Sequence, residues 1–244
     1  IRKEEEFRTV DEEVFDVVIV GGGLAGCAAA YALAKAGVEV VVVERGAFSG
    51  SKNMTGGRLY GHSLEKLIPG FAESAPVERL ITRERLSFLT DDSATTMDFA
   101  SASLGAPACA SYAVLRAPFD QWLAEQAERE GAMFVNEIRV DDLIVRDGRV
   151  CGVRAGEDDM EAKVVLLADG AVSLLGQKLG MVPPLDPHAM AVSAKEVIQL
   201  DEKTVSDRFG CAPGEGCAWL FDGSCTDGHI GGGFLYTNRD SISL

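Results

Sequence analysis

Three glycines near the start of the chain and one carboxylate further along have the spacing of a dinucleotide-binding site. Gly21, Gly23 and Gly26 follow an apolar run at 17–20 as a G-x-G-x-x-G turn, and Glu44 follows a second apolar run. The first glycine permits a tight turn, the second lets backbone approach a pyrophosphate, and the third lets a helix pack on a strand. A pyrophosphate would lie on the helix's unpaired N–H groups, and the acid would bind ribose hydroxyls. The pattern predicts a cofactor enzyme; the alternative is a glycine-rich turn that binds nothing.

The elements that position these residues begin with a strand–helix–strand unit over residues 16–44. Its apolar β-branched runs predict buried parallel strands. Further along, residues 133–155 predict an antiparallel meander, followed by another buried parallel strand at 162–170. This interruption of the β–α alternation favours a flavoprotein over a nicotinamide dehydrogenase. Between the two regions we expect a Gly/Ser/Thr/Asn-rich loop at 46–63, a β-hairpin at 80–99 and an amphipathic helix at 117–129.

The pattern changes from Pro183 onward to successive strands without intervening long helices, which predicts an antiparallel sheet in a second domain. Because the chain stops at Leu244 inside a strand pattern, we expect it to be part of a longer protein. The predicted organisation is a charged leader at 1–14, a discontinuous dinucleotide-binding domain at 15–75 and 106–182, and a second domain at 76–105 and 183–244.

Composition excludes several classes of function. The net charge of −15 opposes binding to nucleic acid or to an anionic lipid surface. No apolar run approaches the roughly 20 residues that a spanning helix needs. The six cysteines have no zinc or iron–sulfur spacing, so no metal site is expected, and the three histidines form no nucleophile–base arrangement. Without a signal sequence, a cytoplasmic location is expected.

Several segments together resemble one family of FAD enzymes. Residues 115–123 (LRAPFDQWL) resemble the R-x-x-F-D-x-x-L segment of glutathione-reductase-type flavoproteins, and residues 166–170 (LLADG) resemble their Asp-Gly motif. The loop 50–59 (GSKNMTGGRL), residues 62–82 and residues 231–238 (GGGFLYTN) are similar to electron-transfer-flavoprotein:quinone oxidoreductases, and within them the FixC type.

This resemblance extends from about Phe15 to Leu244 and implies an α/β fold. The implied architecture is a Rossmann-like FAD-binding domain, with a parallel sheet and an antiparallel β-meander, plus a smaller α+β domain with an antiparallel sheet. Two family features have no counterpart here. These are the Gly-Asp-Ala-rich second flavin motif and the cysteine cluster of the mitochondrial-type enzymes.

The resemblance also implies which residues contact the flavin. Arg116 is expected near the pyrophosphate, the loop with Lys52 beside the isoalloxazine, and Val140, in the first meander strand, against adenine. Asp169 is expected to hydrogen-bond N–H groups or water, and Arg45 to bind adenine or pyrophosphate or to form a surface salt bridge. The complete set of expected FAD-binding residues is Val20, Gly21, Gly22, Gly23, Leu24, Ala25, Gly26, Glu44, Arg45, Lys52, Thr55, Gly56, Gly57, Arg116, Val140, Asp169 and Gly170.

A second site is expected at Gly232, Gly233 and Phe234, because consecutive glycines weaken a strand unless something needs the space. A flat quinone-like ring against bare backbone is one such need, and a bulge is the other.

The implied activity is that of an FAD-dependent oxidoreductase. Its flavin would accept electrons from an electron-transfer flavoprotein and pass them to a quinone or a ferredoxin-like iron–sulfur protein, with no catalytic side chain. One alternative is a flavin monooxygenase or geranylgeranyl-type reductase that consumes NAD(P)H. Another is a non-catalytic, truncated flavin-binding fragment. A peripheral membrane contact through a part beyond Leu244 also stays open.

Overall fold

The computed structural model describes residues 14–229 and 231–244, which divide into two compact units. The predicted leader lies outside the described residues, except for Val14. The first unit comprises Ile1–Ser49 and Leu123–Pro184, and the second comprises Gly50–Trp122 and Leu185–Leu244. Residues 50–75 and 106–122 therefore group with the second sheet, whereas the sequence pattern had placed them with the dinucleotide-binding domain.

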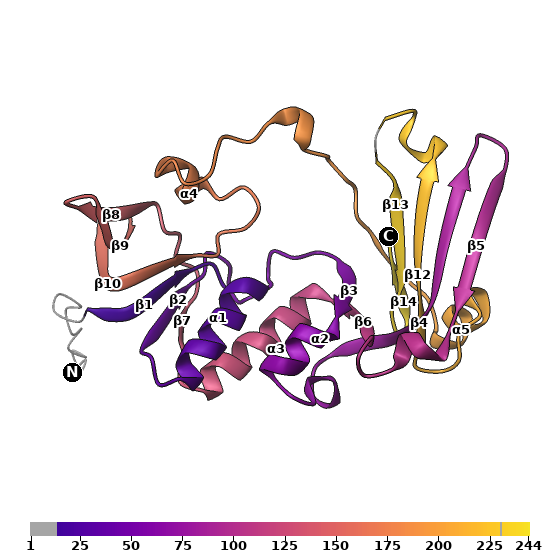
Figure 1. The fold of residues 1–244 in the computed structure, drawn as a ribbon, viewed down its shortest axis with the longest axis horizontal. Helices are drawn as coiled ribbons and strands as arrows, with labels where there is room; N and C mark the ends of the chain where they lie inside the picture. Colours follow the sequence, from indigo (N-terminus) through magenta and orange to yellow (C-terminus); the bar gives the residue numbers. More distant parts are fainter. Residues whose placement is uncertain (1–13, 230) are drawn as a thin grey trace, which may run out of the picture. The chain divides into compact units, whose positions relative to one another are not determined.

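The first unit is built on a six-stranded sheet in the order β7-β2-β1-β10-β9-β8 (Figure 1). β7, β2, β1 and β10 run parallel, and β9 and β8 add antiparallel to β10 as the meander. This is the predicted α/β fold class, with a parallel sheet that continues into a meander. The strands are β1 (Phe15–Val20), β2 (Val40–Val43), β7 (Met133–Val135), β8 (Asp142–Arg146), β9 (Arg149–Ala155) and β10 (Asp158–Leu167).

Helix α1 (Leu24–Lys35) connects β1 to β2, and its small residues explain how closely it packs. Gly26, Ala30 and Ala34 are buried, and so are the four valines of β2. β-branched side chains fill the space on a pleated strand while alanines let the helix approach it. α4 (Leu174–Lys178) follows β10, and the longer helix α3 (Arg116–Arg129) contains residues of both units.

The second unit is built on an eight-stranded, mainly antiparallel sheet. The order of its strands is β11-β14-β13-β12-β4-β6-β3, and β5 pairs with the C-terminal half of β4. Of these neighbouring pairs, only β4 and β12 run parallel. The strands are β3 (Gly56–Tyr60), β4 (Val77–Leu89), β5 (Ala94–Ala100), β6 (Ser111–Leu115), β11 (Val197–Gln199), β12 (Glu215–Gly223), β13 (Gly233–Thr237) and β14 (Ser241–Ser243). Helices α2 (Gly61–Leu67) and α5 (Glu202–Phe209) complete the unit, together with four short 3-10 turns, one of which lies at Phe71–Glu73.

Five features differ from the expectations drawn from the sequence. The expected loop 46–63 ends early, because residues 56–67 form β3 and α2. Helix α5 was not predicted, and residues 190–196, which fall in the region from Pro183 onward where successive strands were expected, are irregular. Val140 lies before β8 rather than inside a meander strand. β10 is not buried on both faces, because Val164 and Leu166 are 51% and 38% exposed.

Arg79 in β4 is a fully buried charge at the end of the second sheet. Its Nε donates to the carbonyl of Asn238 at 2.6 Å, and Nη1 donates to Ser206 Oγ and the Glu215 carbonyl at 3.1 and 3.0 Å. Nη2 donates to the carbonyls of Glu202 and Arg239 at 3.2 and 2.8 Å. All five N–H groups of the guanidinium are therefore used.

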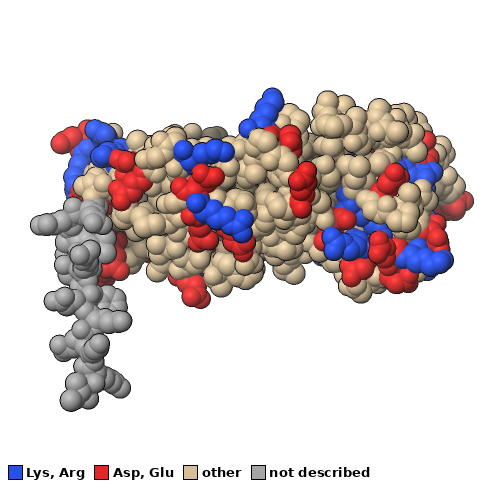
Figure 2. Space-filling model, turned by 90° about the horizontal axis from the view of Figure 1, so that it is seen from below, with Lys and Arg blue, Asp and Glu red and all other residues tan. Residues whose placement is uncertain are grey.

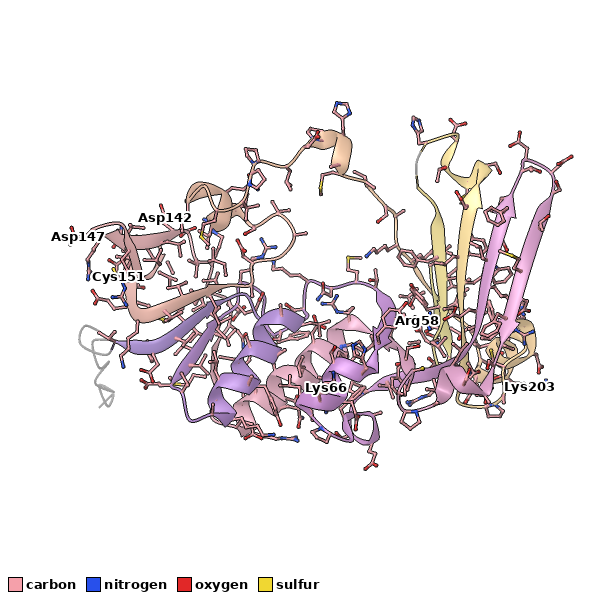
Figure 3. All side chains as sticks on the ribbon, in the orientation of Figure 1. Arg58, Lys66, Asp142, Asp147, Cys151 and Lys203 are labelled. Atoms are coloured by element: carbon pink, nitrogen blue, oxygen red, sulfur yellow. The ribbon has the colours of Figure 1, made fainter. Side chains whose placement is uncertain are left out.

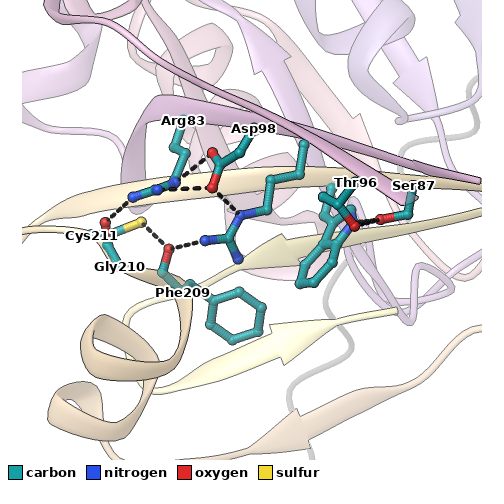
Figure 4. A network of polar contacts seen from close by, with 9 residues as sticks. Arg83, Ser87, Thr96, Asp98, Phe209, Gly210 and Cys211 are labelled. Atoms are coloured by element: carbon teal, nitrogen blue, oxygen red, sulfur yellow. Dashed lines mark hydrogen bonds and ion pairs between the residues drawn. The ribbon is translucent and has the colours of Figure 1, made fainter. Parts of the chain in front are cut away.

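A second polar network fixes the C-terminal end of α5 (Figure 4). Asp98 accepts from Arg83 Nε at 2.7 Å and from Arg85 Nε at 3.0 Å, while the two arginines also donate to the carbonyls of Gly210 and Phe209. The hydrogen bond from Arg83, and then that from Arg85, lowers the pKa of the Asp98 carboxyl. Positive guanidinium groups at a helix C-terminus also stabilise its partial negative charge.

Charged side chains of both signs lie next to one another on the face displayed in Figure 2. On the meander, Arg154 pairs with Asp159 and Arg146 pairs with Glu161. Asp147, which Figure 3 labels at the tip of the β8–β9 hairpin, has a φ of 52° and is followed by Gly148 with a φ of 75°. Within residues 14–229 and 231–244, no helix has the length and apolar character to cross a membrane, and no His/Cys/Asp/Glu cluster could hold a metal.

Candidate dinucleotide-binding site

The glycine turn between β1 and α1 packs so tightly that two of its glycines could carry no side chain. Gly21 has a φ of 105°, and a Cβ there would lie 2.4 Å from the carbonyl oxygen of Ala168, just beyond β10. A Cβ on Gly26 would lie 1.9 Å from the carbonyl oxygen of Gly21. These two glycines are therefore required by the packing of β1, α1 and the end of β10, whatever the turn binds.

Gly23 is different, because a Cβ there would meet no atom within 4 Å. It is the N-cap residue of α1 in extended conformation, and as a glycine it has no side chain with which to cap the helix. The N–H groups of the first helical turn have no intrahelical acceptors, and the helix dipole makes this end positive. The structure therefore offers donors and open space at the point where the motif predicts a pyrophosphate.

Glu44 follows β2 and turns its carboxylate back to the glycine turn. Oε2 accepts from the N–H of Gly22 at 2.8 Å, and Oε1 accepts from the N–H of Gly46 at 2.6 Å. A carboxylate has about four lone-pair sites, so two remain for hydroxyl donors. The half-buried carboxylate is thus held beside the turn and keeps the capacity to bind a ribose.

We expect Glu44→Gln to lower the free energy of unfolding of the first unit by about 1–3 kcal/mol. The amide can offer an oxygen to only one of the two backbone N–H groups, and its NH2 faces the other. Urea unfolding followed by far-UV circular dichroism measures the loss. Glu39→Gln is the matched control, because Glu39 is exposed just before β2. Equal stability of the two variants would show that the Glu44 contacts are not what orders the turn.

Asp169 lies beside the same turn, as expected of parallel strands whose carboxyl ends share one edge. A Cβ on Gly21 would lie 3.4 Å from its Cα. The Asp169 carboxylate accepts from Ser173 Oγ at 2.9 Å and from the N–H of Leu175 at 3.3 Å, so it caps α4. Next to it, Gly170 is exposed with a φ of 91°. The structure thus groups the glycine turn, Glu44 and Asp169 within the first unit.

The remaining candidates of the first unit differ in their position and burial. Val20 is buried at the end of β1, and Leu24 and Ala25 form the first turn of α1. Arg45 is exposed, and Val140 is partly buried against the core of the sheet.

The other FAD-binding candidates belong to the second unit, where three of them lie at or next to the start of α3. The carbonyl of Thr55 accepts from the N–H of Arg116 at 2.9 Å, and Gly56 pairs with Leu115. A Cβ on Gly56 would lie 2.3 Å from Ser243 Oγ, whereas one on Gly57 would meet nothing. Lys52 is exposed. Thr55, Gly56 and Arg116 are therefore brought together within this unit.

Gly232 and Gly233 lie where β13 begins to pair with β12. A Cβ on Gly232 would lie 2.4 Å from the carbonyl oxygen of Phe221, so the neighbouring strand already accounts for a glycine at this position. The ring of Phe234 lies 5.4 Å from that of Tyr236, centroid to centroid.

Tyr236 lines a pocket of about 420 Å³ that sequence reasoning did not find. α5 packs on Cys217 and Leu235, so alternation along β12 and β13 places Ala218, Leu220 and Tyr236 on the opposite face. The only feature of the sequence that could have indicated this pocket is the alternation of apolar residues in three strands. The pocket is lined by Arg58, Tyr60, Glu84, Arg85, Leu86, Met97, Phe99, Ala218, Leu220 and Tyr236.

One side of this pocket is polar. Arg58, labelled in Figure 3, pairs with Glu84 at 2.6 Å, donates to Ser111 Oγ at 2.9 Å and lies 4.7 Å from the ring centroid of Tyr60. Burial raises the pKa of the Tyr236 phenol, which therefore stays protonated and can donate. The other side presents Met97, Phe99 and Leu220, each at least half exposed. The pocket combines an apolar wall with cationic and hydroxyl donors.

Comparison with known proteins places this geometry in context. Residues 16–201 match the family model described as "Glucose inhibited division protein A". The chain is 56% identical over 235 residues to "Probable electron transfer flavoprotein-quinone oxidoreductase YdiS" of Escherichia coli (strain K12). It is 55% identical over 235 residues to "Protein FixC" of Escherichia coli O157:H7. These alignments cover 96% of this chain and 55% of each relative, so the chain spans about half their length.

A solved structure shares the fold at low sequence identity. It is a geranylgeranyl bacteriochlorophyll reductase-like protein from Thermoplasma acidophilum, with a TM-score of 0.67 and 23% identity over 95% of this chain and 56% of that chain. These findings confirm the predicted resemblance to FixC-type proteins and the predicted fold class.

Proposed function

Because the chain belongs to the family described as "Glucose inhibited division protein A", we propose that it is part of an FAD-dependent oxidoreductase of the FixC type. Its relatives' names include an electron transfer flavoprotein-quinone oxidoreductase. We further propose that its electrons come from an electron-transfer flavoprotein and pass to a quinone.

The observation that carries the proposal is the open N-terminus of α1 beside Glu44. Gly23 leaves room for a diphosphate at the N–H groups of the first helical turn, and the Glu44 carboxylate, which the motif assigns to a ribose, accepts from the N–H of Gly22 in that turn. The residues present thus fit the ADP half of FAD. They would hold the nucleotide and orient it, and the flavin, when bound, would supply the electron transfer.

The pocket on the second sheet supports a quinone as the acceptor. Its volume lies within the range of small-molecule sites. Met97, Phe99 and Leu220 can cover the faces of a planar apolar ring, while Arg58 and the protonated Tyr236 can donate to its carbonyl oxygens. A ferredoxin-like iron–sulfur protein would need an exposed docking surface instead of such a pocket.

The test is to load the purified chain with FAD and to follow the flavin absorbance without oxygen. We expect reduction by an electron-transfer flavoprotein and reoxidation by a short-chain ubiquinone. Leu220→Glu should slow the reoxidation by quinone at least tenfold and leave FAD affinity unchanged. The matched control is Val192→Glu, at a fully exposed apolar position of the same unit.

Other outcomes would contradict the proposal in different ways. Rapid reduction by NADPH would indicate a monooxygenase or geranylgeranyl-type reductase. If only a ferredoxin reoxidises the bound flavin, the acceptor is a ferredoxin and not a quinone. A chain that stays colourless after addition of FAD would be a non-catalytic fragment.

A further inference from the structure

We propose that Asp120 is a positioning residue for the cofactor, an inference that rests on the proposed function. Asp120 lies in the first turns of α3 and joins this helix to the loop 50–55. Through these contacts it fixes the guanidinium of Arg116 and the backbone of the loop in one arrangement.

The carboxylate of Asp120 is completely buried. Oδ1 accepts from Arg116 Nε at 2.8 Å, and Oδ2 accepts from Arg116 Nη2 at 2.9 Å and from Asn53 Nδ2 at 2.6 Å. Burial of a carboxylate is costly unless it is paired and hydrogen-bonded, and removal of its charge would leave these donors poorly matched. Three donors from two segments therefore converge on one buried acceptor.

The loop meets the same helix turn at two further points. Gly50 has a φ of 92°, and a Cβ there would lie 2.7 Å from Asp120 Cβ and 2.8 Å from the carbonyl oxygen of Ala117. At the other end of the loop, the carbonyl of Thr55 accepts from the N–H of Arg116. Gly50, Asn53 and Thr55 thus tie the loop to α3 at intervals, and Asp120 supplies the central side-chain contact.

Arg116 keeps donors for a ligand in spite of this pairing. Asp120 binds its Nε and Nη2 edge, the side chain is 31% exposed, and Nη1 has no acceptor in the part of the chain that the structure describes. A guanidinium held bidentately on one edge presents its other N–H groups in a fixed direction, which suits an anionic oxygen such as that of a phosphate. Ordering before binding lowers the entropy that binding must overcome.

The first experiment compares the FAD dissociation constants of Asp120→Asn, Arg116→Gln and the double variant, measured by quenching of flavin fluorescence. We expect each single variant to weaken binding about 10- to 100-fold. Asp120→Asn should lower affinity much less in the Arg116→Gln background than in the wild type, because Asp120 acts partly through Arg116. The matched control is Asp207→Asn, which removes the exposed i,i+4 pair with Lys203 on α5 and should leave FAD affinity unchanged.

A second readout needs no cofactor. Amide hydrogen exchange across residues 50–56 should quicken in Asp120→Asn and also in Asn53→Ala, which leaves the Arg116 pair intact if Asp120→Asn does not fold. Unchanged exchange in Asn53→Ala, or fully additive losses of affinity in the double variant, would overturn the positioning role alone. A wild-type chain that binds no FAD would instead overturn the proposed function, and this inference with it.

Discussion

Arg79→Met is expected to lower the free energy of unfolding of the second unit by about 4 kcal/mol. Methionine fills much of the volume but donates no hydrogen bond, so the carbonyls of Glu202, Glu215, Asn238 and Arg239 lose a buried donor. These carbonyls belong to α5, β12 and the β13–β14 turn, so one side chain holds three elements against β4. Urea unfolding followed by tryptophan fluorescence measures the change, because Trp122 and Trp219 both lie in this unit.

Arg79→Lys separates the charge from the geometry of the donors. Lysine keeps the charge, but its single ammonium group cannot reach all the acceptors spread around the edge of the planar guanidinium, so we expect a loss of about 2 kcal/mol. Arg208→Ala is the matched control on exposed α5 surface and should change stability by less than about 0.5 kcal/mol. If the free energy of unfolding of Arg79→Met lies within about 1 kcal/mol of the wild-type value, water replaces the lost donors and Arg79 does not hold these elements together.

Arg79 also shows where sequence reasoning stops. Arg79, Arg83 and Arg85 lie on one strand and share a residue type, but only the first is fully buried. The difference arises from α5 and the β13–β14 turn, which meet Arg79 from more than 120 residues away in the sequence. A local sequence pattern cannot predict contacts between segments so far apart in the sequence. The pocket on the opposite face was not predicted for the same reason, because its lining comes from distant strands.

The local elements were predictable because their signals lie within short windows. The β1–α1–β2 unit, the hairpin of β4 and β5, and α3 with its buried Phe119 and Trp122 all match the expected periodicity. Helix α5 was missed although Asp201 caps it and Gly210 ends it with a φ of 64°. It is short and flanked by turn-rich residues, so its capping signals resemble those of a loop.

The sequence predicted the backbone elements of the candidate cofactor site, which are the glycine turn and the strands and helix that flank it. Gly21 and Gly26 are required by contacts inside the fold, so their presence alone is no proof of a ligand. Gly23 and the Glu44 carboxylate carry the functional signal, because the fold leaves space at one and lone pairs at the other. The distinction between these two kinds of glycine can be tested directly.

Gly23→Ala is expected to weaken FAD binding by at least 100-fold without unfolding the protein. The added methyl group meets nothing in the fold, and φ −78° with extended ψ is allowed for alanine. Alanine is a poorer N-cap than glycine but restricts the unfolded chain, and these effects oppose each other, so stability should stay within about 1 kcal/mol. The methyl group would occupy the space that a diphosphate needs to reach the N–H groups of α1.

Gly26→Ala provides the opposite case on the same turn. Its methyl group would overlap the carbonyl of Gly21, so we expect a loss of stability of about 2 kcal/mol or more together with any loss of affinity. Ala32→Ser, which adds one atom on the exposed side of α1, should change neither quantity. FAD titration and urea unfolding of the three variants then separate ligand contact from packing. If the FAD dissociation constant of Gly23→Ala lies within threefold of the wild-type value, no diphosphate approaches this turn. A ligand that contacts the backbone directly would be displaced by a methyl group placed between the two.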